Sequence, residues 1–123
     1  MVESPSRSMT VLAALLGALM VGSGVMKVAG ESHQVAAFAA WALPPWFRLL
    51  VGTFEIVGGV LLLVPQTSPV GSMILSTIMV GAIWTHVAAG EWSHLVPVAV
   101  MLVLFVLIFR SNQLRLVRLL GVV

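Results

Sequence analysis

Cysteine and tyrosine are absent from this chain of 123 residues, and charged residues are scarce. Without cysteine, the chain alone can form neither a thiol–disulfide relay nor a thiolate metal site. Without tyrosine, it has no phenol to serve as a general acid or to hold a radical. Charged residues make up 8% of the sequence, whereas about a quarter of the residues in a soluble domain are charged. The composition therefore excludes an ordinary soluble domain.

Hydrophobic residues make up 60% of the chain and are concentrated in long runs. A helix needs roughly 20 apolar residues to cross a bilayer, so the chain has room for about four spans. The first run is too long for a typical cleaved signal peptide. We predict an all-α fold, a four-transmembrane-helix bundle that forms one integral membrane domain of residues 1–123. The predicted spans are residues 9–29, 46–64, 70–88 and 95–109.

The segments outside these runs predict a turn, an interfacial helix and a surface tail. Residues 65–69, "PQTSP", have proline at both ends and predict a tight turn. In residues 30–45, apolar side chains recur at helical spacing, which predicts a short interfacial helix between the first two spans, ended by Pro44–Pro45. The tail, residues 110–123, mixes arginine with leucine and valine and is expected to lie on the membrane surface.

The basic residues predict the orientation of the chain. Four of them flank one side of the membrane: Arg7, Arg110, Arg115 and Arg118. Lys27 and Arg48 flank the other side. By the positive-inside rule, both termini are expected in the cytoplasm, with the protein in a bacterial inner (plasma) membrane. Four tryptophans then lie near the outer surface as an interfacial belt: Trp41, Trp46, Trp84 and Trp92.

Residues 20–33 and residues 79–94 resemble one another. Both contain M-V-G, then lysine or histidine, then V, A, G-E and S-H, so that Lys27 corresponds to His86. Two pseudo-repeated helix pairs, related by an axis along the membrane normal, would explain this internal similarity, which we call the echo. Chance is the alternative, because a chain built from few residue types repeats itself easily. Only one half of such a repeat carries an acid inside a span, which favours a specific role for that acid.

That acid is Glu55, which lies inside the second hydrophobic run. Four residues of this run share one helix face at spacings of i, i+4, i+7 and i+11: Arg48, Gly52, Glu55 and Gly59. The glycines let a neighbouring helix or a ligand approach. A carboxylate in hydrocarbon is penalised unless a cation or hydrogen-bond donors meet it. Glu55 is therefore a structural lock bonded to Lys27 or His86, a proton-handling or ligand-orienting group, or the coupling acid of a transporter.

Polar residues of the other spans fall on the same, outer side of the membrane as this face. We predict a polar pocket that opens outward, with Glu55, His86 and Lys27 as its chemically active residues. The predicted ligand-contacting residues are Arg48, Gly52, Thr85, Trp41, Trp46, Trp84 and His94. His86 and His94 flank a turn, but no recognised metal-ligand spacing is present, so no metal is expected. Haem ligation through histidine or methionine stays open.

Three segments resemble the DoxX-like family of small four-helix membrane proteins: "GVMKVAG", "AAFAAWALPPWFRLLVGTFEIVGGVLLLVP" and "GSMILSTIMVGAIWTHVAAGE". The lysine, G-x-x-E and T-H positions of the family pattern fall on Lys27, on Gly52 and Glu55, and on Thr85 and His86. The resemblance implies a four-helix membrane bundle. The wider group includes membrane subunits of thiosulfate:quinone oxidoreductases, so the resemblance suggests a quinone as one ligand.

Three functions stay open. The leading one is a membrane protein that holds a lipophilic small molecule, a quinone being one candidate, as a subunit or accessory of a redox or catabolic system. Its electrons would come from a soluble or membrane oxidoreductase partner, because the chain has no recognisable flavin, nicotinamide or iron–sulfur motif. The alternatives are a stand-alone isomerase or hydrolase, acting on an epoxide or alkene through Glu55 and His86, and a small proton-coupled transporter. Besides the lipid bilayer, a second copy of the chain is a plausible partner, whereas nucleic acid is not, because the basic residues form no patch.

Overall fold

The computed structural model describes residues 7–113, 117 and 120–121, and every regular element among them is helical. Four helices, the last taken together with the turn before it, are long and apolar enough to cross a membrane. Their limits lie within about three residues of those of the predicted spans, because unbroken apolar runs mark the spans directly. Half of the predicted surface tail, including Arg115 and Arg118, lies outside the described residues. The elements are α1 (Arg7–Ala29), α2 (Ser32–Ala40), α3 (Pro45–Leu63), α4 (Ser68–Ala89), the 3-10 turn η1 (Trp92–His94) and α5 (Leu95–Ser111).

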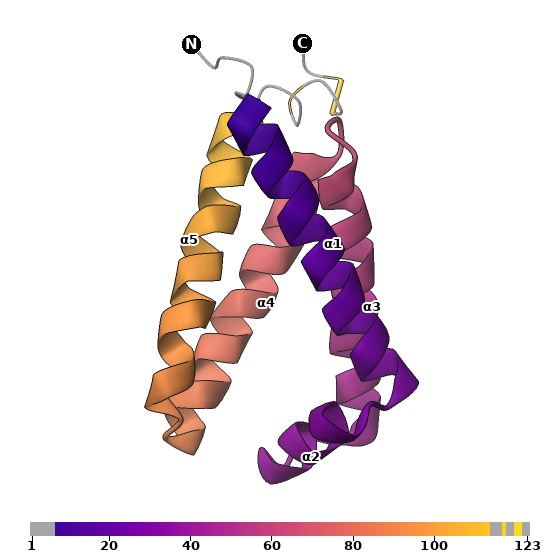
Figure 1. Cartoon of the computed structure of the whole chain (residues 1–123), viewed down its shortest axis with the longest axis vertical. Helices are drawn as coiled ribbons and strands as arrows, with labels where there is room; N and C mark the ends of the chain where they lie inside the picture. Colours follow the sequence, from indigo (N-terminus) through magenta and orange to yellow (C-terminus); the bar gives the residue numbers. More distant parts are fainter. Residues whose placement is uncertain (1–6, 114–116, 118–119, 122–123) are drawn as a thin grey trace.

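The long helices form two pairs that meet at one end and diverge at the other (Figure 1). α1 packs along α3, α4 packs along α5, and contact between α3 and α4 joins the two pairs. The pairs approach each other where α1 begins and α5 ends, which we call the terminal end. α2 lies at the opposite end of the bundle, which we call the α2 end.

Two glycine pairs let α1 and α3 come into close contact. A Cβ atom on Gly24 would lie 2.5 Å from the carbonyl oxygen of Gly52. A Cβ atom on Gly17 would lie 2.8 Å from the carbonyl oxygen of Gly59. Small residues at such crossings allow two helix backbones to approach each other. The helix face of Gly52 and Gly59 therefore meets a neighbouring helix, as the sequence predicted.

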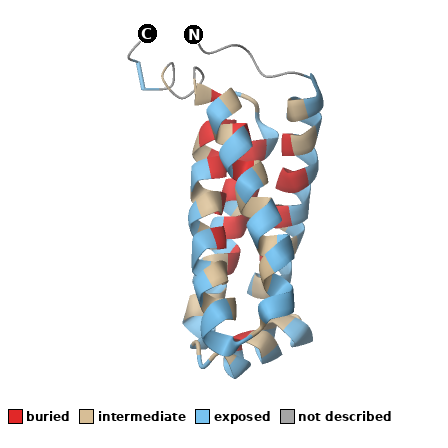
Figure 2. Cartoon of the chain, turned by 90° about the vertical axis from the view of Figure 1, so that its left-hand side faces the viewer, coloured by how far each residue is buried: buried red, intermediate tan, exposed pale blue. Residues whose placement is uncertain are grey.

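The apolar core fills mainly the terminal half of the bundle. Its buried side chains are Ala13, Leu16, Met20, Leu62, Leu75, Met79, Phe105 and Ile108. Figure 2 shows the buried residues concentrated toward the terminal end. The helix pairs diverge away from this core toward the α2 end (Figure 1).

The interfacial helix ends earlier than predicted. α2 stops at Ala40, before the pair Pro44–Pro45. Ala42 adopts a left-handed backbone conformation, with φ of 58°. The N–H group of Leu43 then donates to the carbonyl of Phe38, at 2.9 Å, which closes the helix with a Schellman-type turn. The prolines instead start α3, where the fixed φ of proline suits the first helical position.

Candidate functional site

A cavity of about 560 Å³ lies between the diverging helix pairs, in the part of the bundle nearer the α2 end. All five α-helices contribute to its wall, and most of the lining side chains are apolar. Three phenylalanines, Phe38, Phe47 and Phe54, line it together with aliphatic residues. Its volume falls within the range of small-molecule sites, which combine an apolar wall with a few polar groups. The polar side chains of the wall are Ser23, Lys27, Gln34, Glu55, Thr77, Thr85 and His86.

A buried ion pair between Lys27 and Glu55 lies in the wall formed by α1 and α3. The ammonium group of Lys27 donates to Oε1 of Glu55 at 3.1 Å and to Oγ of Ser23 at 2.9 Å. Glu55 is only 3% exposed, and the side chain of Lys27 is 12% exposed. From the sequence alone, either Lys27 or His86 could be the partner of Glu55. In the structure the partner is Lys27. Removing one member of such a pair leaves a buried charge without compensation.

The backbone contact of α1 and α3 places this lysine. A Cβ atom on Gly52 would lie 2.8 Å from Cβ of Lys27, so the glycine makes room for the lysine side chain to pass along α3 toward Glu55. Arg48 does not pair with Glu55. Its Nη1 donates to the carbonyl oxygen of Lys27 and so satisfies one of the last carbonyls of α1. The cation near the end of α1 also suits the negative end of the helix dipole.

The opposite wall, formed by α4, carries Thr85 and His86. Nδ1 of His86 lies 2.8 Å from Oε1 of Glu91, and Nε1 of Trp41 donates to the same oxygen at 2.9 Å. The indole of Trp41 also meets the imidazole of His86 edge-on, with ring centroids 5.4 Å apart. Glu91 therefore ties the end of α2 to the end of α4, across the two halves of the chain.

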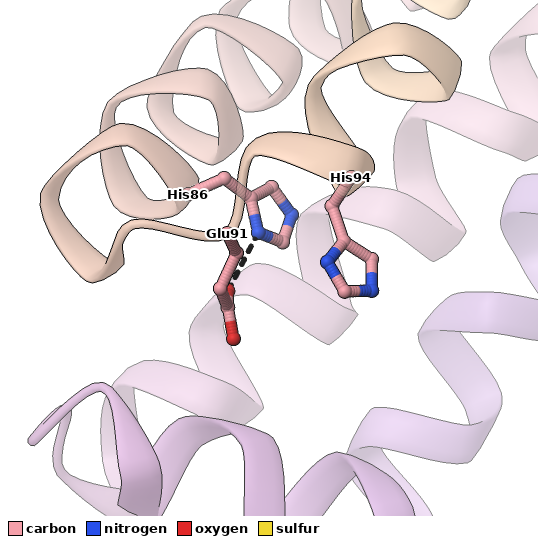
Figure 3. A group of neighbouring side chains, drawn as sticks. All are labelled: His86, Glu91 and His94. Atoms are coloured by element: carbon pink, nitrogen blue, oxygen red, sulfur yellow. Dashed lines mark hydrogen bonds and ion pairs between the residues drawn. The ribbon is translucent and has the colours of Figure 1, made fainter.

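These contacts depend on the turn that follows α4. Gly90 has a φ of 71°, a left-handed conformation that turns the chain back on itself after the helix. The N–H group of Glu91 then donates to the carbonyl of His86 at 2.9 Å. The hydrogen bonds from His86 and Trp41 stabilise the charged form of the carboxylate and lower the pKa of Glu91. His94 follows at the start of α5, and its ring stacks on that of His86 with centroids 5.1 Å apart (Figure 3).

The structure brings half of the predicted site residues into the cavity wall. Those that line it are Lys27, Trp41, Glu55, Thr85 and His86. Those outside the lining are Arg48, Gly52, Trp46, Trp84 and His94. Trp46, Trp84 and Trp92 instead lie exposed at the α2 end, where the predicted interfacial belt requires them.

Sequence reasoning did not foresee the role of Glu91 or the aromatic lining. Glu91 was visible as one glutamate of the echoed G-E pair, but nothing in the echo showed that Trp41 would reach it. Phe38, Phe47 and Phe54 belong to three different turns of two helices, so only the packing of α2 against α3 brings them to one cavity.

A model of the DoxX-like family matches residues 11–108, which is most of the chain. Searches among curated proteins and among solved structures returned no match. The matched region contains all four spans almost completely, as well as Lys27, Glu55 and His86. The chain is therefore a small integral membrane protein that belongs to the DoxX-like family.

Proposed function

We propose that this protein binds a lipophilic small molecule with polar oxygens at two positions, such as a quinone, in the cavity between α1/α3 and α4. One observation carries the proposal: a mostly apolar cavity of about 560 Å³ has the Lys27–Glu55 pair on one wall and His86 on another. An apolar wall with a few placed polar groups is the usual composition of a site for a small organic ligand.

The polar groups retain hydrogen-bonding capacity for such a ligand. An ammonium group has three N–H donors, and Ser23 and Glu55 accept two of those of Lys27. The third donor is available to a ligand carbonyl. His86 uses Nδ1 toward Glu91, which leaves Nε2 as its second hydrogen-bonding atom. Phe38, Phe47 and Phe54 supply aromatic surface against which a flat ring can pack.

The proposed role is that of a membrane subunit or accessory of an oxidoreductase. Reduction of a quinone to a hydroquinone takes up two electrons and two protons. A partner oxidoreductase would supply the electrons, while Glu55 and His86 would pass protons to the two ligand oxygens. We also propose that both termini are cytoplasmic in a bacterial inner membrane. Arg7 and Arg110 then lie inside, and the α2 end with its cavity faces the exterior.

Native mass spectrometry of the protein, extracted gently from its own membrane, tests the proposal. We expect a bound small molecule of defined mass with the wild type and its loss in Glu55→Gln. The amide cannot carry a proton to the ligand, and it removes the negative charge that pairs with Lys27. Trp84→Phe is the matched control, since Trp84 is 76% exposed and lies outside the cavity lining.

Two results would contradict the proposal. One is a wild-type protein that carries no small molecule and does not bind an added short-chain quinone. The other is a Glu55→Gln variant that keeps the ligand but fails to accumulate in the membrane while Glu55→Asp accumulates normally. That result would make Glu55 a structural lock.

A further inference from the structure

Three side chains at the rim of the cavity have the composition and spacing of a metal site. His86, Glu91 and His94 each offer one ligand atom, and these atoms all lie within 4.8 Å of one another. Figure 3 shows the three side chains gathered on one side of the turn between α4 and α5. Around a tetrahedral zinc ion, with bonds of about 2.0–2.2 Å, neighbouring ligand atoms are roughly 3.3 Å apart. Nδ1 of His86 and Oε1 of Glu91 are already 2.8 Å apart. His94 is exposed and stacks on His86, so within the described part of the chain a rotation of its ring meets no surrounding side chain other than that partner.

We propose that His86, Glu91 and His94 bind one divalent transition-metal ion. Two imidazoles and one carboxylate, without a thiolate, form a donor set typical of zinc and related first-row ions. Three protein ligands leave a fourth position for water or for a ligand oxygen. His86 also lines the cavity, so the ion would lie at the cavity rim.

The backbone of the turn holds the three residues in place before any ion binds. The N–H group of Glu91 donates to the carbonyl of His86 at 2.9 Å, and the N–H group of His94 donates to the carbonyl of Glu91 at 3.1 Å. Each proposed ligand is thus joined to the next by a backbone hydrogen bond. This preorganisation lowers the entropic cost of bringing three ligands around one ion.

Trp41 supplies the outer hydrogen bond that such sites commonly have. Its Nε1 donates to Oε1 of Glu91 at 2.9 Å, which fixes the carboxylate, while neither Trp41 nor His86 bonds Oε2. A metal would replace the proton shared by His86 and Glu91, or bind through Oε2. Loss of an outer partner of this kind weakens metal affinity by about 10–100-fold.

The other half of the chain provides an internal control. His33 lies 2.8 Å from Glu31, with the same pair of atoms as His86 and Glu91. The sequence similarity aligns His86 with Lys27, whose ammonium group is bonded to Glu55, and the turn geometry aligns His86 with Met26. Among the residues that the structure describes, no third ligand group joins His33 and Glu31, so this pair should not hold an ion by itself.

Calorimetric titration of Zn²⁺ into the full chain tests the proposal, with the protein in mild detergent, any histidine tag removed and bound metal stripped by a chelator. We expect one ion per wild-type chain. His94→Ala should lower the affinity by at least about tenfold, and Trp41→Phe by a comparable factor. His33→Ala should leave the affinity unchanged. Because His94 is exposed, His94→Ala is expected to fold, and the thermal unfolding midpoint checks this.

Titration with Co²⁺ gives a readout that does not depend on heats of binding. Visible absorption bands of low-coordinate Co²⁺ should appear with the wild type and with His33→Ala, and should be absent with His94→Ala. The proposal is overturned if the wild type binds no Zn²⁺, or if His33→Ala weakens binding as much as His94→Ala does. Neither titration requires a molecule in the cavity, so the outcome is separate from that of the proposed function.

Discussion

The turns after α1 and after α4 have the same backbone conformation, but their glutamates accept hydrogen bonds from different partners. Gly30 and Gly90 both have left-handed φ values, 76° and 71°. The next N–H group donates in each case to a carbonyl five residues earlier, from Glu31 to Met26 and from Glu91 to His86. Glu31 then accepts from the N–H groups at the start of α2 and caps that helix. Glu91 makes no side-chain cap bond and accepts instead from His86 and Trp41.

The difference comes from a shift of one residue. The sequence echo aligns Lys27 with His86, but the hydrogen bonds of the turns align His86 with Met26 and Lys27 with Val87. The second segment has one more alanine before its glycine. One residue turns a side chain by about 100° around a helix. Lys27 therefore points to α3 and Glu55, whereas His86 points to its own turn. Similar sequences can thus place equivalent polar groups in different sites.

Breaking the Lys27–Glu55 contact and the His86–Glu91 contact separately should show the largest difference. Lys27→Met leaves Glu55 buried without its cation, which we expect to cost about 3–5 kcal/mol of unfolding free energy. His86→Leu should cost much less, because the side chain of Glu91 is 33% exposed and keeps its bond from Trp41. Thermal or denaturant unfolding in detergent measures both. Equal losses would contradict the comparison, and the double change Lys27→Met with Glu55→Leu should recover much of the lost stability.

A smaller effect is expected from the close glycine contact between α1 and α3. Gly24→Ala would place a Cβ 2.5 Å from the Gly52 carbonyl oxygen and force α1 and α3 apart, which should cost about 1–3 kcal/mol. Gly22→Ala is the matched control on the same helix, since nothing lies within 4 Å of its added Cβ. The same unfolding measurement distinguishes them. If both variants lost equal stability, the glycine contact would not hold the helices together.

The smallest effect on stability should come from protonating Glu31, the N-cap residue of α2. The hydrogen bond from the His33 side chain, with those from the backbone, lowers the pKa of Glu31 from 4.5 to about 2. Because the pKa of Glu31 is lower in the folded than in the unfolded protein, the cap stabilises the fold fully at any pH above the unfolded pKa. This stabilisation is lost only as pH falls through about 2. The amide proton shift of Gln34, followed by NMR against pH, should therefore have its midpoint near 2, and a midpoint near 4.5 would show an uncapped helix.

Much of the fold was predictable because long apolar runs directly indicate membrane-spanning helices. The burial of Glu55 beside two glycines was also predictable, since spacing alone puts these residues on one helix face. The choice of Lys27 over His86 as its partner was not, because it depends on a single extra residue before Gly90. The bond from Trp41 to Glu91 was equally hidden, since it depends on a turn in which the next residue, Ala42, takes a left-handed conformation that usually signals glycine.

The uneven placement of the core has a dynamic consequence. Local opening events cost little where few apolar groups are buried, and they approach the global unfolding free energy where the core is dense. Amide hydrogens near the α2 end should therefore exchange with solvent much faster than those around Phe105 at the terminal end. The ligand that we propose for the cavity would then enter and leave through partial opening of this end, without unfolding of the whole protein.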